Sequence, residues 1–341
     1  MKKSIFIILI LLFTNCLSAK NDYKLVWPNE PDEPRIEFLN IATNPSEFEI
    51  EKGFFTKIYD FILGEEQMTL ASPFGIYADD IRVYVTDVSL KSVYIFDKEE
   101  DEVITIEGSQ TERFLYPIDV VSDSNGKIYV SDSIRAKIYV FNYDGEFIYT
   151  INSNLFKRPV GLVVNDSENK LYIVDAVASK VHVTTLKGKF LYSIGKHGGG
   201  DGEFNKPTFI AKDSAGNLYV TDSMNHRIQI LDKNGKFIRK FGQLGQKIGD
   251  FASPRGIALD KNNNIYISDT MFNNIQIFNT SGELLMVFGS YGVRFGEFSL
   301  AEDISILQDG TIYVTDTHNK RVQVFKLLDV NKKRSIKWSI Y

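Results

Sequence analysis

The segment from Tyr219 to Phe237 places an acid, an imidazole and a guanidinium in one turn between two strand-like runs. Asp222 precedes His226 by four residues and Arg227 by five. A carboxylate that orients a histidine is an arrangement used in acid–base and nucleophilic catalysis. The same residue types also stabilise turns, because an aspartate accepts hydrogen bonds from backbone N–H groups. Recurrence of the turn along the chain distinguishes these two interpretations.

The turn recurs six times. A motif of the type Tyr-Val-Thr-Asp or Tyr-Ile-Ser-Asp ends at Asp87, Asp132, Asp175, Asp222, Asp269 and Asp316. These aspartates are 45, 43, 47, 47 and 47 residues apart, a period typical of propeller blades. A cationic residue follows five positions later in four copies, namely Lys137, Lys180, Arg227 and Arg321. Because catalytic residues break a repeat and this set follows it, we interpret the turn as structural and expect the cation to pair with the aspartate.

Each unit has the pattern of four short antiparallel strands. Apolar residues alternate with Tyr, Thr or Ser before the aspartate, and a second alternating run begins after a five-residue turn. A proline about fifteen residues before most of the aspartates opens a further short run at the start of each unit, and turn pairs such as Asn234-Gly235 lead to the fourth run at its end. Six such units over residues 70–327 predict an all-β fold, a six-bladed β-propeller of four-stranded antiparallel blades.

The sixth unit lacks a clear fourth strand of its own. The segment at residues 35–42 resembles the fourth strands of the other units, and we expect it to complete the last blade. The tail at residues 328–341 is the competing candidate for this position. The only predicted helix is short, over residues 45–63, and its apolar face would pack on the propeller or touch a membrane or a partner.

The N-terminus has the layout of an export signal. Lys2 and Lys3 precede an apolar run that is too short to span a bilayer, and Cys16 lies just after this run. The pattern resembles a bacterial lipoprotein signal in which Cys16 is lipidated, although ordinary cleavage after Ala19 is the alternative. We therefore divide the chain into a signal segment (1–19), a tether (20–34) and a single propeller (35–341) in the cell envelope, on the periplasmic or cell-surface side of a membrane.

Composition excludes some classes of function. The net charge is −5, which disfavours nucleic acid as a partner. Cys16 is the only cysteine, so the exported body folds without disulfides and has no thiol nucleophile. The four histidines do not converge at matching repeat positions of adjacent units, which argues against a histidine-based metal site or catalytic triad.

The units resemble NHL repeats. The match is best in units four, five and six, which read "GEFNKPTFIAKDSAGNLYVTDSMNHRIQILDKNG", "GDFASPRGIALDKNNNIYISDTMFNNIQIFNTSG" and "FGEFSLAEDISILQDGTIYVTDTHNKRVQVF". It is looser in the first three units. The order of leader, short helix and six repeats is also similar to bacterial NHL-repeat lipoproteins of undefined activity. This resemblance implies the fold but not one function, since NHL propellers include sensor domains, binding domains and a metal-dependent lyase.

Positions where the repeat departs from itself are the candidate ligand site, because an asymmetric ligand requires asymmetric contacts. At the start of the innermost strands, the units with distinctive residues contribute Asp119, Phe209, Arg255, Glu302 and Asp303. These side chains could hold a cation or a polar group at the mouth of the channel. The sequence thus predicts a non-catalytic, lipid-anchored binding or scaffold module for a protein, peptide or glycan. The alternative is a metal-dependent lyase or hydrolase with calcium or zinc in the channel; no cofactor is otherwise expected.

Overall fold

The structure is a computed structural model that describes residues 24–29, 31–43, 69–100 and 102–328. The predicted signal segment with Cys16, the predicted helix at residues 45–63 and the tail after Leu328 lie outside these ranges. Within them, no helix is long and apolar enough to cross a membrane.

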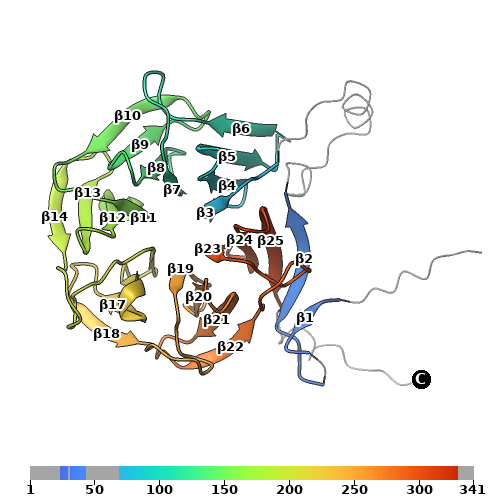
Figure 1. Cartoon of the computed structure of the whole chain (residues 1–341). Helices are drawn as coiled ribbons and strands as arrows, with labels where there is room; N and C mark the ends of the chain where they lie inside the picture. The colour runs from blue at the N-terminus through green and yellow to red at the C-terminus, as the bar shows by residue number, and fades with distance from the viewer. Residues whose placement is uncertain (1–23, 30, 44–68, 101, 329–341) are drawn as a thin grey trace, which may run out of the picture.

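Six antiparallel sheets are arranged as blades around a central channel (Figure 1). Blades 1 and 2 are formed by β3 (Pro73–Ala78), β4 (Arg82–Asp87), β5 (Ser92–Asp97) and β6 (Glu102–Ile106), and by β7 (Pro117–Ser122), β8 (Ile128–Asp132), β9 (Lys137–Phe141) and β10 (Phe147–Asn152). Blade 3 consists of β11 (Pro159–Asn165), β12 (Lys170–Asp175), β13 (Lys180–Thr185) and β14 (Phe190–Ile194). The prediction of a six-bladed propeller is confirmed.

The next two blades repeat the same order of strands. Blade 4 consists of β15 (Ile210–Lys212), β16 (Leu218–Asp222), β17 (Arg227–Leu231) and β18 (Phe237–Phe241), and blade 5 of β19 (Pro254–Leu259), β20 (Ile265–Asp269), β21 (Asn274–Phe278) and β22 (Leu284–Phe288). Two short 3-10 turns, η2 (Asp166–Glu168) and η3 (Ser223–Asn225), are the helical elements of the described ranges.

The sixth blade joins the two ends of the described chain. Its order is β1-β2-β25-β24-β23, with β23 (Ala301–Ile306), β24 (Thr311–Asp316), β25 (Arg321–Leu327), β2 (Ile36–Ala42) and β1 (Val26–Trp27). Strand β2 is the segment expected at the outer edge of this blade, and it pairs antiparallel with β25 from Ile36↔Leu327 to Ala42↔Val322. The ring is therefore closed within one sheet, where strands from the N-terminal side pair with strands from the C-terminal side.

The strand register defines two faces of the ring. Pro73 at the start of β3 pairs with Asp87 at the end of β4, and Asp87 pairs with Ser92 at the start of β5. The starts of the innermost strands, the repeated aspartates and the connections between blades therefore all lie at one end of the ring. We call this end the upper face, and the opposite end the lower face.

The repeated tyrosine is buried between blades, and its hydroxyl still finds a partner. Tyr129, which is fully buried, donates a hydrogen bond of 3.0 Å to Asp123 in the turn at the lower face. Tyr266 makes the equivalent bond to Asp260 at 3.3 Å. A large side chain with one polar atom is tolerated there because that atom is hydrogen-bonded while the ring packs in the core.

The repeated aspartate is a structural joint, as the repeat implied. Asp222 is fully buried and accepts hydrogen bonds from the backbone N–H of Asn205 at 2.7 Å and from Nε of Arg227 at 2.8 Å. Arg227 also donates to the backbone oxygens of Gly199 and Gly200, which fixes the connection between blades 3 and 4. Asp316 and Arg321 form the same pair at 2.8 Å in blade 6.

The expectation that the cation pairs with the aspartate is wrong in the other two units. Lys137 instead forms an ion pair of 2.7 Å with Glu112 of the preceding connection. No ion pair between Lys180 and Asp175 is found among the described residues; His182 is the basic group nearest that carboxylate, at 3.8 Å. A lysine offers one charged nitrogen, whereas the arginine fork can bind the aspartate and the loop carbonyls together.

Candidate functional site

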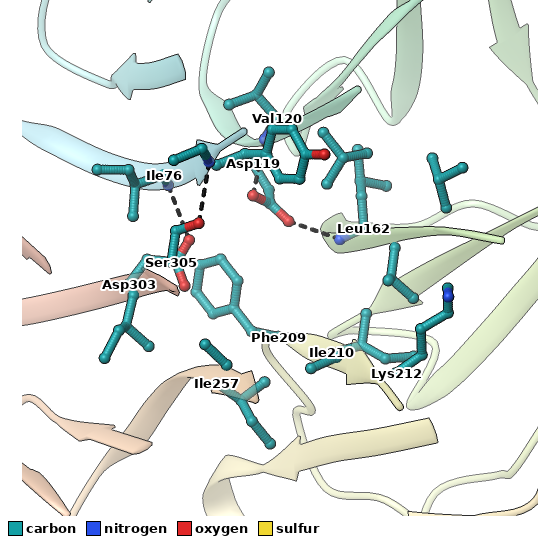
Figure 2. A pocket seen from close by; sticks show the side chains of 18 of the residues that line it. Ile76, Asp119, Val120, Leu162, Phe209, Ile210, Lys212, Ile257, Asp303 and Ser305 are labelled. Carbon is teal, nitrogen blue, oxygen red and sulfur yellow. Dashed lines mark hydrogen bonds between the residues drawn. The ribbon is translucent and has the colours of Figure 1, made fainter. Parts of the chain in front are cut away.

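A cavity of about 370 Å³ occupies the central channel. All six innermost strands line it, mostly with Ile, Val, Leu and Ala side chains (Figure 2). Its lining begins at Asp119, Phe209 and Asp303 and continues toward the lower face as far as Lys212 and the exposed Asp166. The cavity thus has an apolar wall with polar groups at both ends. Its volume is in the range typical of small-molecule pockets.

One position of the innermost strands alternates around the ring. Blades 1, 3 and 5 have glycine, and blades 2, 4 and 6 have larger residues: Gly75, Asp119, Gly161, Phe209, Gly256 and Asp303. A Cβ atom on Gly161 would lie 2.7 Å from Cα of Phe209, and one on Gly256 would lie 2.6 Å from Cα of Asp303. Each odd-numbered blade therefore approaches the next blade so closely that only glycine fits there.

Asp119 and Asp303 use their carboxylates to bind the backbone of the next blade. Asp119 accepts a hydrogen bond of 2.7 Å from the N–H of Leu162 in blade 3. Asp303 accepts one of 2.9 Å from the N–H of Ile76 in blade 1. Both side chains are about 4% exposed, so they satisfy backbone donors that water reaches poorly. These two predicted site residues line the channel and also hold neighbouring blades together.

The two carboxylates are electrostatically coupled across the channel. Burial raises the pKa of Asp119 to about 7, although the N–H groups of Leu162 and Val120 oppose this shift. Burial, and then the negative charge of Asp119, raise the pKa of Asp303 well above its ordinary value. Two buried carboxylates that sense each other resist being ionised together, so near neutral pH the pair readily takes up a proton or a cationic group.

An aromatic pair lies at the upper end of the cavity. Phe209 is 4% exposed, and its ring projects into the channel (Figure 2). Its centroid lies 6.4 Å from the ring of Phe74, which comes from blade 1 on the opposite side of the ring. The contact therefore spans the channel. Phe74 was not predicted from the sequence, because its proximity to Phe209 exists only once the ring has closed.

Arg255 and Glu302 lie one position earlier on their strands, and neither residue lines the cavity. Nη1 of Arg255 is 3.8 Å from Oε2 of Glu302, which is too long for a hydrogen bond. That oxygen and Nε of Arg255 are both buried without a hydrogen-bond partner among the described residues. Burial raises the pKa of Glu302, while the charges of Arg255 and His318 oppose the shift. The five predicted residues thus form two groups: three at the cavity and two on its upper side.

A Ser-His-Asp arrangement in blade 3 was missed by reasoning from the sequence. Nδ1 of His182 is 2.8 Å from Oγ of Ser193, and its Nε2 is 3.8 Å from Oδ2 of Asp175. His182 is only 2% exposed, and its Nε2 makes no hydrogen bond among the described atoms. A hydrolytic triad needs a tight Asp–His bond and a nucleophile that a substrate can reach. The geometry therefore supports a packed interior cluster.

The described residues contain no group of three or more His, Cys, Asp or Glu side chains placed to hold a metal ion. The carboxylate oxygens of Asp119 and Asp303 accept backbone hydrogen bonds instead. A metal in the channel would have to share these carboxylate oxygens with their backbone N–H donors, and only two carboxylates of the described chain would be available at that end to hold it.

The raised pKa values predict that stability decreases as pH rises. In the unfolded chain such a carboxyl group ionises near pH 4, whereas in the folded chain it keeps its proton up to its raised pKa. Between these two pH values, a rise in pH favours the unfolded chain. For Asp119 this window extends from about pH 4 to about 7. The free energy of unfolding should fall by up to about 1.4 kcal/mol for each pH unit across the window.

Urea unfolding at several pH values measures this effect. The Asp119→Asn variant should show a flatter pH profile than the parent chain. Asp144→Asn, on an exposed turn, serves as the matched control and should keep the parent slope. If stability depended on pH in the same way in the parent chain and in both variants, Asp119 would have to be ionised in the folded state over the whole pH range.

Comparison with known proteins is consistent with this geometry. A family model described as a 6-bladed β-propeller matches residues 101–154 and 210–276, and a model of the NHL repeat matches residues 298–325. No curated protein matches the chain.

Among solved structures, a protein of unknown function from Bacteroides thetaiotaomicron is 15% identical, with a TM-score of 0.64, and the match covers 86% of this chain and 76% of that one. An auxiliary nutrient binding protein from the same organism is 14% identical, with a TM-score of 0.60 and coverage of 76% and 70%. A catalytically inactive virginiamycin B lyase from Staphylococcus aureus, solved with quinupristin, is 14% identical, with a TM-score of 0.57 and coverage of 75% and 95%. At these identities the similarity establishes the fold alone. The chain is an NHL-type six-bladed β-propeller.

Proposed function

We propose that the chain is an exported binding module, held at a membrane by a lipid on Cys16, which receives part of a protein, peptide or glycan ligand in the channel. The single observation that supports this most is the cavity of about 370 Å³ with the carboxylates of Asp119 and Asp303 at its upper end. Its apolar walls and acidic end suit an aliphatic group that ends in a positive charge or in hydrogen-bond donors.

The scaffold is suited to recognition. The blades are fixed by buried joints such as Asp222–Arg227, so the channel wall is rigid and little conformational entropy is lost when a ligand binds. One protein of similar fold is described as a nutrient binding protein, which shows that the architecture can serve binding. Lys212 and Asp166 line the lower end of the cavity, and we propose that the ligand enters there.

Site-specific photo-crosslinking in cells tests this function. A photoreactive amino acid at Lys212 should cross-link a defined partner, whereas one at Arg239, exposed on the outer strand β18, should not. Asp119→Asn and Asp303→Asn should weaken the product at Lys212 on the order of tenfold if a cationic group is bound. The same products at both positions, or products unaffected by the two variants, would contradict binding in the channel.

A metal-dependent lyase or hydrolase is the second candidate. The observation in its favour is that two carboxylates, whose oxygens are ligands of hard cations, face the cavity. Metal analysis of the purified chain separates the two candidates. Stoichiometric calcium or zinc that is lost on Asp119→Asn or Asp303→Asn would favour the enzyme.

A further inference from the structure

The five most exposed large hydrophobic side chains of the described chain lie on the upper loops of blades 5 and 6. Their exposed fractions range from 67% to 78%, for Leu244, Ile248, Met271, Tyr291 and Val293. We call these five residues the blade 5–6 patch. Single exposed hydrophobic residues are ordinary on a protein surface, but clustering of the most exposed ones marks an interaction site.

The loops that carry the patch are held together by hydrogen bonds. The N–H of Gly249 donates to Oε1 of Gln276 at 3.0 Å, which ties the connection before blade 5 to β21. The N–H of Leu300 donates to Oδ1 of Asn273 at 2.8 Å, which ties the next connection to the turn of Met271. Phe251 and Phe298 in these connections are fully buried. Fixed loops therefore present the patch, so its exposure is a property of the folded state.

The turns and connections that project from the upper face have more basic than acidic residues, although the chain has a net negative charge. The upper turns and the described connections between blades comprise residues 88–91, 107–116, 133–136, 153–158, 176–179, 195–206, 223–226, 242–253, 270–273, 289–300 and 317–320. These segments contain ten Lys and Arg but six Asp and Glu, whereas the whole chain has a net charge of −5. Next to the patch, Lys247, Arg294 and Lys320 are exposed, and Arg294 forms an ion pair of 2.6 Å with Glu297 of the same loop. Hydrophobic side chains interspersed with cations match an anionic lipid surface.

The N-terminal end of the described chain lies beside one of the patch loops. A Cβ atom on Gly296 would lie 2.5 Å from the ring of Trp27 and 3.0 Å from Leu25. The ring of Phe295 in the same loop stacks on Phe38 of β2, with centroids 5.2 Å apart. Eight residues lead from Cys16 to Lys24, and they can span at most about 28 Å. A lipid on Cys16 would therefore hold a bilayer within reach of the patch.

We propose that the blade 5–6 patch docks onto an anionic phospholipid bilayer. Its apolar side chains enter the boundary between headgroups and acyl chains, and the neighbouring Lys and Arg side chains contact the lipid phosphates. The lower end of the channel then faces away from the membrane. This inference goes beyond the proposed ligand-binding function and is tested without a lipid on Cys16.

Vesicle sedimentation tests the proposal with the unlipidated chain from Lys20 to Tyr341, which contains every described strand. The chain should bind vesicles of phosphatidylglycerol and phosphatidylcholine, and bind vesicles of phosphatidylcholine alone much more weakly. Binding should fall when the salt concentration is raised to about 0.5 M, because salt screens the charges. The double variant Met271→Glu, Tyr291→Glu should weaken binding on the order of tenfold or more.

The matched control is the double variant Ile238→Glu, Leu285→Glu on the outer strands β18 and β22, where the side chains are 45% and 43% exposed. It should bind as the parent does, and circular dichroism should show that both variants are folded. Absence of binding to the anionic vesicles, or equal losses in both variants, overturns the proposal. Self-association that the patch variant abolishes, without vesicle binding, would instead assign the patch to a second copy and overturn it as well.

Discussion

Replacing Asp222 with alanine is expected to lower the free energy of unfolding by roughly 3–5 kcal/mol, because it leaves the buried guanidinium of Arg227 without its carboxylate. The two side chains are 0% and 8% exposed, and their atoms are 2.8 Å apart, so solvent cannot replace the missing partner. The variant also loses the acceptor for the N–H of Asn205. Urea or thermal unfolding of the purified body measures the loss.

Asp132→Ala is the matched control, because Asp132 accepts backbone bonds from Leu115 and Ile134 while Lys137 pairs elsewhere. Its loss should be smaller, about 1–3 kcal/mol. Adding Arg227→Met to Asp222→Ala should recover part of the stability, since the unpaired charge is then removed. Asp222→Ala and Asp132→Ala could instead lower the free energy of unfolding equally, with no recovery of stability in the double variant. That result would show that the buried Asp222–Arg227 charge pair does not contribute to stability.

Removing the closing strand is expected to abolish the monomeric fold. A chain that begins at Thr43 lacks β2, which covers the whole length of β25 through pairs from Ile36↔Leu327 to Ala42↔Val322. The truncated blade would expose an unpaired edge and the buried positions that Ile36 and Ala42 fill. Size-exclusion chromatography should show aggregates or strand-exchanged oligomers in place of the monomer.

A chain that begins at Arg35 lacks only β1 and serves as the control, since β1 pairs with β2 through just two residue pairs. It should remain folded with a modest loss of stability. A synthetic peptide of residues 31–43 should restore monomers to the shorter chain by completing the blade. A soluble monomer that begins at Thr43 and shows the parent circular dichroism spectrum would falsify this account of ring closure.

The sequence predicts the blades well because the repeat averages out local ambiguity. Strands that are individually short become unmistakable when Tyr, Val and Asp recur at the same register, as in the segments that end at Asp222 and Asp316. The place of β2 is similarly predictable, because a blade without an outer strand needs one from elsewhere in the chain. By contrast, the predicted pairing of Lys137 with its aspartate is wrong because Glu112 from the neighbouring connection competes for the same cation.

The candidate site is predictable only in part. Departures from the repeat identified Asp119, Phe209 and Asp303, which the fold brings together at the cavity. The same reasoning grouped Arg255 and Glu302 with them, although adjacent residues of a strand point to opposite sides. Which side faces the channel depends on how neighbouring blades approach one another. The sequence pattern does not specify the distance between neighbouring blades. For the same reason it did not predict that Phe74 lies opposite Phe209.

The alternation of glycine and larger residues around the channel makes neighbouring blades non-equivalent. At Gly161 and Gly256 the backbone of the following blade comes so close that a Cβ atom would not fit. Excision or duplication of a single blade would place two glycines or two large residues side by side, leaving either a void or a clash. Pairs of blades, in contrast, could be exchanged without breaking the pattern. The unit in which such a ring can grow, shrink or be recombined is therefore two blades, although its visible sequence repeat is one.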